Sequence, residues 1–268
     1  MNLFYDSQSV QNQENHMKNN FSKLLMVCLT LSALPFSALQ ADEYEDLIGA
    51  AVSNPARLES NSSRDELRKP AEVIKFMGVK PGMVVLDLIA TGGYYTEILA
   101  GVVGNDGRVI THEFADKGMD PDYAMAAHIR NSRNLDNVVP IYADLKDLDL
   151  KENSVDQVFF IQNFHDLYFN VYNTDPAKTL AVFRKALKPG GTLAVVDHVA
   201  EDSAPSTTGN SIHRISPVLT KRVLGEAGFV FEEESYILRN NTDDITKNVF
   251  APDVRGRTSR FIHRYTSP

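Results

Sequence analysis

The sequence predicts an α/β fold in which seven strands form a doubly wound sheet, with an N-terminal helical flap and an antiparallel last strand pair. Short apolar runs alternate with helix-like segments from residue 83 to residue 228, as in parallel sheets whose strands are joined by helices. The last two apolar runs, 229–238 and 259–265, are separated only by a polar loop. Without a helical crossover, these two strands should pair antiparallel at one edge of the sheet.

Five strands are expected before that pair, each a short apolar run bounded by turn residues. They cover residues 83–88, 108–113, 138–142, 157–162 and 192–197. Helices are expected at residues 94–102, within 122–133, from Asp175-Pro176 to 187, and from Ser216-Pro217 to Ala227-Gly228. The turn Lys188-Pro189-Gly190-Gly191 is expected to end the third helix and to precede the fifth strand.

The composition suits one globular α/β domain. The chain has 268 residues, of which 43% are hydrophobic and 23% charged, and its net charge is −8. A nucleic-acid-binding surface needs clustered lysine and arginine, which the sequence lacks, so no nucleic-acid partner is expected. The only cysteine, Cys28, lies in the predicted leader, so the mature chain would use neither disulfides nor thiolate chemistry.

Residues 1–41 are predicted to be a leader with a secretory signal peptide. Two lysines precede an apolar run over 24–39, and Ala41 offers a small residue for cleavage. Translation is expected to start at Met17, because residues 1–16 are polar and unlike a signal. The protein would then be exported, periplasmic or secreted, with no stable membrane anchor after cleavage. A retained anchor is the alternative.

The mature chain divides into a flap and a main domain. Residues 42–78 are predicted to form the helical flap, with one helix over 42–52 and a second that begins at Ser63 or Asp65 and is interrupted by a proline. Residues 79–268 are predicted to form the α/β domain. No feature of the sequence predicts the oligomeric state.

Acidic residues stand at the carboxyl ends of the first three predicted strands, as Asp87, Glu113 and Asp144. Gly92 and Gly93 follow Asp87 in the turn to the next helix, where glycine lets the backbone approach a ligand. Glu113 follows Asp87 at about the spacing at which an acid meets a ribose in dinucleotide folds. Because ligands of open α/β sheets bind at this edge, the pattern predicts a nucleotide-type ligand.

Polar residues also follow the fourth and fifth strands. Asn163, His165 and Asp166 follow the fourth, and Asp197 and His198 end the fifth. No pair or triplet of these groups has the spacing of metal ligands along the chain, so no metal site is predicted. The two His-Asp pairs could still meet in space, which leaves a metal as a minor alternative.

A polar loop, 199–215, is long enough to be a lid and ends in His213-Arg214. His213 joins His165, Asp166 and His198 as a candidate general base, because histidine titrates near neutrality. His165 is the first choice, since it directly follows a strand. The alternative is that His165 donates to a backbone carbonyl and fixes its loop.

These motifs resemble those of the class I S-adenosylmethionine-dependent methyltransferases, which are Rossmann-like enzymes. The resemblance covers about residues 63–266 and is stronger to an exported branch of predicted methyltransferases. Its motifs in this chain are VLDLIATGGYYT, THEF, Ala143-Asp144, SVDQVFF, LKPGG before LAVVDH, Gly92-Gly93-Tyr94, Asn163-Phe164-His165-Asp166 and His213-Arg214.

The resemblance implies roles for individual residues. Asp87 and the Gly92-Gly93-Tyr94 turn would hold the methionine moiety of the cofactor. Glu113 would bind the ribose, and Asn163 would line the pocket near the methionine end. The adenine would lie against Phe114, Asp144 and Leu145.

The chain departs from the family at Ile89 and Thr91, where the family has glycines and where side chains would narrow the cofactor loop. The resemblance implies methyl transfer to an unidentified small-molecule acceptor. The main alternative is an exported binding protein that keeps the fold without methyl transfer. An NAD-type oxidoreductase is disfavoured, because the chain lacks the G-x-G-x-x-G turn.

Overall fold

The computed structural model describes residues 34–114, 135–172 and 174–268. The predicted helix within 122–133 therefore lies outside the described residues. The chain divides into two compact units, 1–46 and 47–268, and the fold described below is that of the second.

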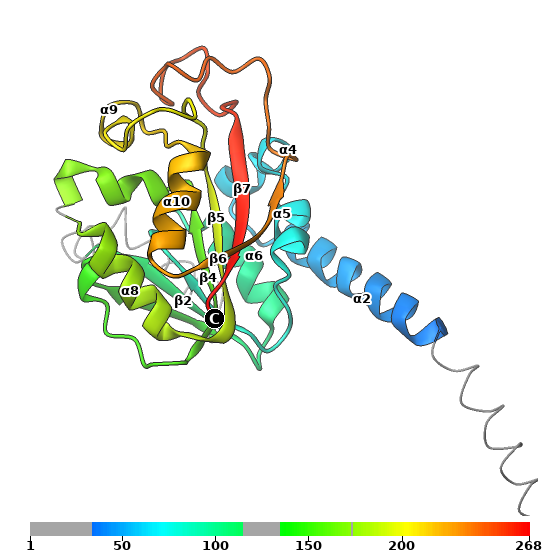
Figure 1. Cartoon of the computed structure of the whole chain (residues 1–268). Coiled ribbons are helices and arrows are strands. Elements are labelled where there is room, and N and C mark those ends of the chain that lie inside the picture. Colours follow the sequence, from blue (N-terminus) through cyan, green and yellow to red (C-terminus); the bar gives the residue numbers. More distant parts are fainter. Residues whose placement is uncertain (1–33, 115–134, 173) are drawn as a thin grey trace, which may run out of the picture. The chain divides into compact units, whose positions relative to one another are not determined.

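Seven strands form one sheet in the order β3-β2-β1-β4-β5-β7-β6 (Figure 1). The first five strands pair in parallel, and β7 is antiparallel to both β5 and β6. The predicted fold class and the antiparallel last pair are confirmed. In the sheet, β7 lies between β5 and β6, and β6 forms the edge. The strands are β1 (Val84–Asp87), β2 (Arg108–Glu113), β3 (Val138–Tyr142), β4 (Val155–Ile161), β5 (Leu187–His198), β6 (Val230–Ser235) and β7 (Arg260–Thr266).

The strand order reverses direction at β1. This strand pairs with β2 on one side and with β4 on the other, so the chain first builds outward in one direction and then in the other. In open α/β sheets the connections diverge at such a point and leave a crevice at the carboxyl ends of the strands. The fold thus places the ends of β1 and β4 beside a natural binding site.

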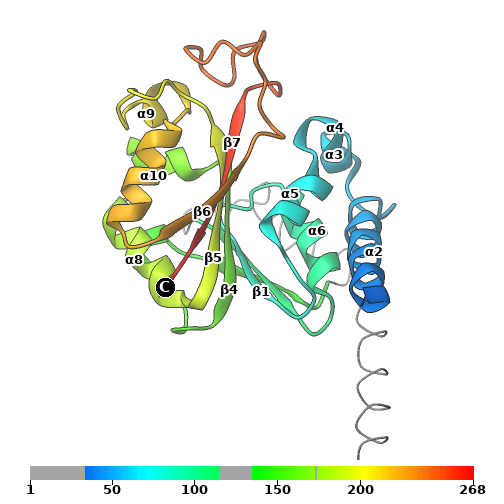
Figure 2. The same cartoon turned by 45° about the vertical axis from the view of Figure 1, so that its right-hand side comes forward.

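Helices cover both faces of the sheet. Figure 2 shows α5 (Pro70–Met77) and α6 (Tyr94–Val103) on one face, and α8 (Pro176–Ala186) and α10 (Pro217–Glu226) on the other. Each of the four buries apolar side chains against the strands, and Ile74, Ile98, Phe183 and Leu224 are fully buried. This burial drives the assembly of the layers.

The starts of α8 and α10 are set by local sequence. Asp175 accepts a hydrogen bond from the Lys178 amide at 3.0 Å, and Ser216 accepts one from the Leu219 amide at 3.1 Å. A proline follows each cap at the first helical position. Both helices begin where the cap-and-proline pattern predicts.

The segment Lys188–Gly191 differs from its prediction as a turn, because β5 already begins at Leu187. Val155 pairs with Leu187, but Gln157 pairs with Thr192, so β5 bulges between these contacts. The amide of Gly190 donates to the Ser267 carbonyl, and the Ser267 amide donates to the Gly191 carbonyl, both at 2.8 Å. Pairing with the end of β7 therefore holds this segment in the sheet.

The predicted interruption of the second N-terminal helix at its proline is confirmed. The predicted helix from Ser63 or Asp65 to 76 is split into α4 (Asp65–Arg68) and α5, with Lys69 at φ 44° between them. Pro70 disfavours the helical conformation for the residue before it, which explains the break.

The remaining helices are α2 (Leu34–Val52), α3 (Glu59–Ser62) and α9 (Thr208–Ile212). α2 contains the expected helix over 42–52 and begins before the predicted cleavage position. No helix in the described ranges is both long and apolar enough to span a bilayer.

Candidate active site

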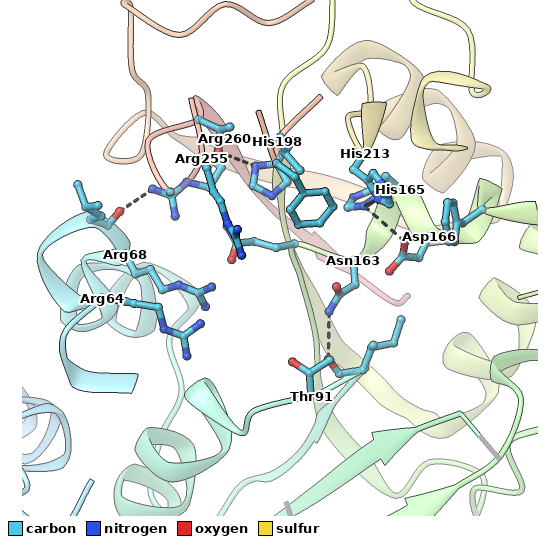
Figure 3. A pocket seen from close by; sticks show the side chains of 18 of the residues that line it. Arg64, Arg68, Thr91, Asn163, His165, Asp166, His198, His213, Arg255 and Arg260 are labelled. Atoms are coloured by element: carbon cyan, nitrogen blue, oxygen red, sulfur yellow. Dashed lines mark hydrogen bonds and ion pairs between the residues drawn. The ribbon is translucent and has the colours of Figure 1, made fainter. Parts of the chain in front are cut away.

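A cavity of about 540 Å³ opens at the carboxyl edge of the sheet (Figure 3). A smaller one of about 100 Å³ adjoins it beside the loop after β1. Both cavities are lined by Arg64, Arg68, Ile89, Thr91, Gln162 and Asn163. The structure therefore places one continuous site at the edge where the polar residues of the sequence were expected to meet.

Asp87, at the end of β1, lines the smaller cavity together with Gly92 and Tyr94. It is 4% exposed and accepts a 2.7 Å hydrogen bond from the Thr96 hydroxyl. Burial raises the pKa of Asp87 to about 7, although the bond from Thr96 acts in the opposite direction. A cationic ligand group beside this buried carboxylate would stabilise its charged form.

The loop after β1 is held in a strained conformation. Ile89 and Thr91 have φ values of 50° and 43°, in the left-handed region that glycine adopts at least cost. Both are β-branched, for which this conformation is rare. The two positions where the sequence lacks the family's glycines are therefore those where the backbone requires a glycine-like conformation.

Side chains from β2 and from the segment after β4 hold this loop through its backbone. His112 accepts a hydrogen bond from the Ile89 amide at 3.3 Å, and Asn163 donates to the Ile89 carbonyl at 3.1 Å. Glu113 accepts from the Thr91 amide and is 2% exposed. These contacts stabilise a loop geometry that the local sequence would not favour.

His112 is a functional-site residue that the sequence analysis missed. Its Nε2 lies 2.8 Å from the Ala143 carbonyl, so Nε2 carries the proton and Nδ1 accepts from Ile89. Burial lowers the pKa of His112 to about 4 and keeps the ring neutral. Its position directly before Glu113 at the end of a strand was the available signal.

The residues assigned to the adenine lie at the ends of β2 and β3. Phe114 is buried and stacks on Tyr172, with ring centroids 4.1 Å apart and planes 12° apart. The Asp144 side chain is 47% exposed and lies 3.8 Å from the Lys146 ammonium. Leu145 is fully buried in the hydrophobic core, so its place beside the adenine stays a prediction.

His165 follows β4 and is paired with Asp197 at the end of β5. Its Nδ1 lies 2.9 Å from Asp197 Oδ1, and its amide donates to Oδ2 at 2.7 Å. The His198 amide also donates to the Asp197 carboxylate, which is fully buried. Neighbouring parallel strands thus bring together two residues far apart in sequence. His165 Nδ1 contacts a carboxylate and not the backbone carbonyl of the alternative interpretation.

The opposite charges of His165 and Asp197 stabilise each other. Burial alone would lower the pKa of His165, but the Asp197 carboxylate outweighs it and the pKa is raised above its usual value. Burial would raise the pKa of Asp197, but His165 outweighs this effect and lowers it. Asp197 therefore fixes the ring so that Nε2 faces the cavity.

Two further groups surround the His165 Nε2 atom. His213 Nδ1 lies 3.3 Å away, and Asp166 Oδ1 lies 3.4 Å away. Burial raises the pKa of Asp166 to about 6, and burial lowers that of His213. The loop that ends at His213 returns to β4, so three of the four histidine and aspartate candidates form one cluster.

The fourth candidate, His198, also lines the cavity but stands apart from this cluster. Its Nδ1 lies 2.7 Å from the Thr258 hydroxyl, and burial lowers its pKa to about 3. Arg214 does not face the cavity. It is fully buried and forms a 2.8 Å ion pair with Asp243, so its role is structural.

Four arginines line the cavity, and the sequence analysis did not identify them: Arg64, Arg68, Arg255 and Arg260. Figure 3 shows Arg64 and Arg68 across the cavity from His165 and His213. No carboxylate of the described residues forms an ion pair with any of the four. Arg260 is 6% exposed, and its buried Nε has no hydrogen-bond partner in the described structure. Arg64 and Arg68 are half-buried and Arg255 is exposed. Four guanidinium groups around one cavity, without a carboxylate partner among the described residues, favour an anionic ligand.

Comparisons with known proteins agree with this architecture. A family model described as a methyltransferase domain matches residues 79–233. The chain is 24% identical to a SAM-dependent methyltransferase from Aquifex aeolicus of known crystal structure, with a TM-score of 0.57, over 77% of this chain and 93% of that one. At this identity the likeness shows the fold.

Curated relatives match a shorter part of the chain. A demethylmenaquinone methyltransferase of Staphylococcus aureus (strain MRSA252) is 28% identical over 126 residues, 47% of each chain. The ubiquinone/menaquinone biosynthesis C-methyltransferase UbiE of Teredinibacter turnerae is 30% identical over 129 residues, 46% of each chain. The chain thus spans about half the length of the curated relatives that it matches.

Proposed function

The chain belongs to the family of methyltransferase domains, and from this premise we propose that it transfers a methyl group from S-adenosylmethionine to a small-molecule acceptor. The observation that carries the proposal is the convergence of polar side chains at one sheet edge. Asp87 lines the smaller cavity, Asn163 lines both, and His165 and His198 line the larger. The two adjoining cavities suit a cofactor and an acceptor that meet between them.

The residues of the smaller cavity match the methionine end of the cofactor. Asp87 offers a buried carboxylate to the α-ammonium group, and Arg64 and Arg68 offer guanidinium groups to the α-carboxylate. Beyond this cavity, Glu113 offers a carboxylate to the ribose, since one carboxylate can accept several hydrogen bonds in addition to the one from Thr91.

When bound, S-adenosylmethionine supplies a methyl group attached to a sulfonium sulfur, which is a good leaving group. The protein's task is to align the acceptor with that carbon and to exclude water. His165 Nε2 faces the larger cavity and takes the acceptor proton, while Asp197 holds the ring and stabilises the charge that develops on it. Asp197 is a positioning residue in this scheme.

The walls of the larger cavity indicate the class of acceptor. Phe169, Tyr172 and Phe250 supply aromatic surface, and the arginines supply positive charge. An acceptor with a ring, an ionisable hydroxyl and an anionic group would satisfy both features. The named activities of the curated relatives, methylation in quinone biosynthesis, are consistent with an aromatic acceptor but concern those proteins.

Methyl transfer is tested with S-adenosylmethionine labelled in its methyl group and a panel of hydroxylated aromatic acids, with matched compounds that lack the acid group. Labelled product and S-adenosylhomocysteine are expected only with the acids. Arg255→Gln should lower kcat/KM for the acceptor without changing cofactor affinity. Arg257→Gln is the matched control, because Arg257 is exposed and does not line the cavity.

A second candidate function is an exported binding protein without methyl transfer. Two observations favour it: the strained residues Ile89 and Thr91 in the cofactor loop, and Tyr172, which covers a face of Phe114 where an adenine would stack. In that case the arginine-lined cavity would bind its anionic ligand, but the labelled methyl group would not be transferred. Export of either protein rests on the predicted signal peptide, and N-terminal sequencing of the secreted or periplasmic form tests it.

A further inference from the structure

The larger cavity contains a cluster of two histidines and one carboxylate whose side-chain atoms converge on one point. Ligand atoms of His165, Asp166 and His213 all lie within 4.8 Å of one another. These residues have no metal-ligand spacing along the chain, because His213 reaches His165 and Asp166 only through the loop after β5. We propose that these three residues bind a divalent transition-metal ion, with zinc as the first candidate.

The distances within the cluster are those of metal ligands. Two ligand atoms that each lie about 2.1 Å from a tetrahedral ion are about 3.4 Å apart. The His165 Nε2 atom lies 3.3 Å from His213 Nδ1 and 3.4 Å from Asp166 Oδ1. The three ligand atoms all lie within 4.8 Å of one another, so small side-chain rotations would bring the third pair to the same spacing. Two imidazoles and one carboxylate are a donor set that suits zinc, iron and related ions.

Asp197 supplies the outer contact that metal-binding histidines require. It accepts a hydrogen bond from the Nδ1–H group of His165, which leaves the lone pair of Nε2 directed at the cluster. Asp197 is itself fixed by the amides of His165 and His198 and is fully buried. This carboxylate–histidine arrangement orients the His165 ring before an ion binds.

Aromatic packing holds His213 in a strained backbone conformation. Its φ is 55°, a left-handed conformation that costs energy for a residue other than glycine. The rings of Phe169 and Phe250 each lie 5.0 Å from the His213 ring. A conformation that is unfavourable locally but held by its surroundings is typical of a functional position.

Three protein ligands leave the ion open toward the cavity of about 540 Å³. This extension rests on the proposed function. An acceptor hydroxyl at an open position would lose its proton to solvent more readily, because a divalent cation lowers the pKa of a bound hydroxyl. In the metal-loaded protein the ion would take over the task that His165 performs without it.

The test is equilibrium dialysis of the tag-free full chain against Zn²⁺, with Co²⁺ as the spectroscopic probe. One equivalent of either ion should be retained at the cluster, and Co²⁺ should give the visible absorption of a site with nitrogen ligands. His213→Ala and Asp166→Asn should lose this absorption and weaken affinity at least tenfold. Asp197→Asn should weaken affinity by about tenfold to hundredfold, because it acts through His165.

His198→Asn is the matched control. This histidine lines the same cavity but is bonded to Thr258, so its replacement should leave metal binding unchanged. Thermal unfolding followed by circular dichroism verifies that each variant is folded. Folded wild-type protein that binds neither ion, or a His213→Ala variant that keeps the wild-type affinity, would overturn the proposal and leave a simple His165–His213 hydrogen bond.

The same samples separate this proposal from the proposed function. Calorimetric titration with S-adenosylmethionine is performed on the metal-free and the metal-loaded chain. Zinc binding without cofactor binding would support the metal site and count against methyl transfer. Cofactor binding with no retained ion would do the reverse.

Discussion

The two halves of the site differ in what their polar side chains bind. In the half beside the β1 loop, His112, Glu113 and Asn163 all bond to the loop backbone. In the half beside β4 and β5, His165 and His213 both line the cavity, and their ring nitrogens lie 3.3 Å apart. The first half is a rigid frame for a ligand, and we term it the cofactor end. The second presents reactive groups, and we term it the acceptor end.

This difference implies that the two ends can be altered separately. Changes at the acceptor end should affect turnover without affecting cofactor affinity. Changes at the cofactor end should affect cofactor affinity and the stability of the domain, because the loop is part of the packed structure. The following variants test that separation.

The largest effect is expected for His165→Gln at the acceptor end. Loss of the group that takes the acceptor proton should lower kcat by about 10²- to 10⁴-fold, measured with an acceptor found in the labelling experiment. The affinity for S-adenosylmethionine should stay within error of wild type. A comparable loss of cofactor binding would show that the two ends are not separate.

Asp87→Asn should have opposite effects on cofactor binding and on stability. Removal of the charge should weaken S-adenosylmethionine binding about tenfold or more, because hydrogen bonds to charged groups are the stronger ones. The pKa of Asp87 is about 7 when folded and near 3.8 when unfolded. The folded state therefore holds a proton that the unfolded state releases, and the stability from this group is lost as pH rises from about 4 to 7.

Above pH 7 the Asp87→Asn variant should consequently be more stable than wild type, on the order of 1.4 kcal/mol per unit of pKa shift. Urea unfolding at pH 5 and pH 8 measures the difference. Equal stability of the two proteins at pH 8 would contradict the assignment of a costly buried charge to Asp87.

Tyr172→Ala tests whether the adenine and Tyr172 compete for Phe114. The stacked pair contributes about 0.5–1.5 kcal/mol, which a bound adenine must replace. The variant should bind S-adenosylmethionine up to about tenfold more tightly in a calorimetric titration. Tyr236→Ala removes an exposed tyrosine elsewhere and serves as the control. Weaker binding by Tyr172→Ala would instead mean that Tyr172 contacts the cofactor.

The smallest effect is expected for Thr91→Gly. Glycine adopts the left-handed conformation of this position without strain, so the free energy of unfolding should rise by about 1 kcal/mol. Asn153→Gly is a matched control, because Asn153 has φ 53° but does not line the site, and asparagine tolerates this conformation better. Its gain should be smaller and cofactor affinity should not change. A destabilised Thr91→Gly variant would show that the threonine side chain stabilises the loop.

The sequence predicted the fold well where the signals are local. The apolar runs of β2 and β3 and the caps Asp175 and Ser216 determine their elements through neighbouring residues, and these elements appear where expected. The bulge at Gly190 was missed, because its backbone partner, Ser267, directly follows β7 and is far from Gly190 in the sequence.

The same distinction holds for the site. Asp87, Asn163 and His165 line the cavities as predicted from their places at or after strand ends, because strand ends meet at one edge. Glu113 lines neither cavity and binds the loop backbone, so its ribose contact stays a prediction. The arginines of the cavity could not be found this way, because they come from α4 and the residue before it, and from the start of β7 and the segment before it. The contact of Asp197 with His165 depends on which strands are neighbours, a property of the sheet order rather than of either strand.

The central claim, that the sheet edge binds S-adenosylmethionine, is tested most directly by calorimetric titration of this compound into the full chain and its Glu113→Ala variant, with NAD as the control ligand. Binding in the micromolar range, roughly −8 kcal/mol, that is lost or strongly weakened in Glu113→Ala and is not seen with NAD, is the expected result. Unchanged affinity in the variant would contradict the site assignment. No binding by the folded wild-type chain would contradict the methyltransferase function and favour the binding protein.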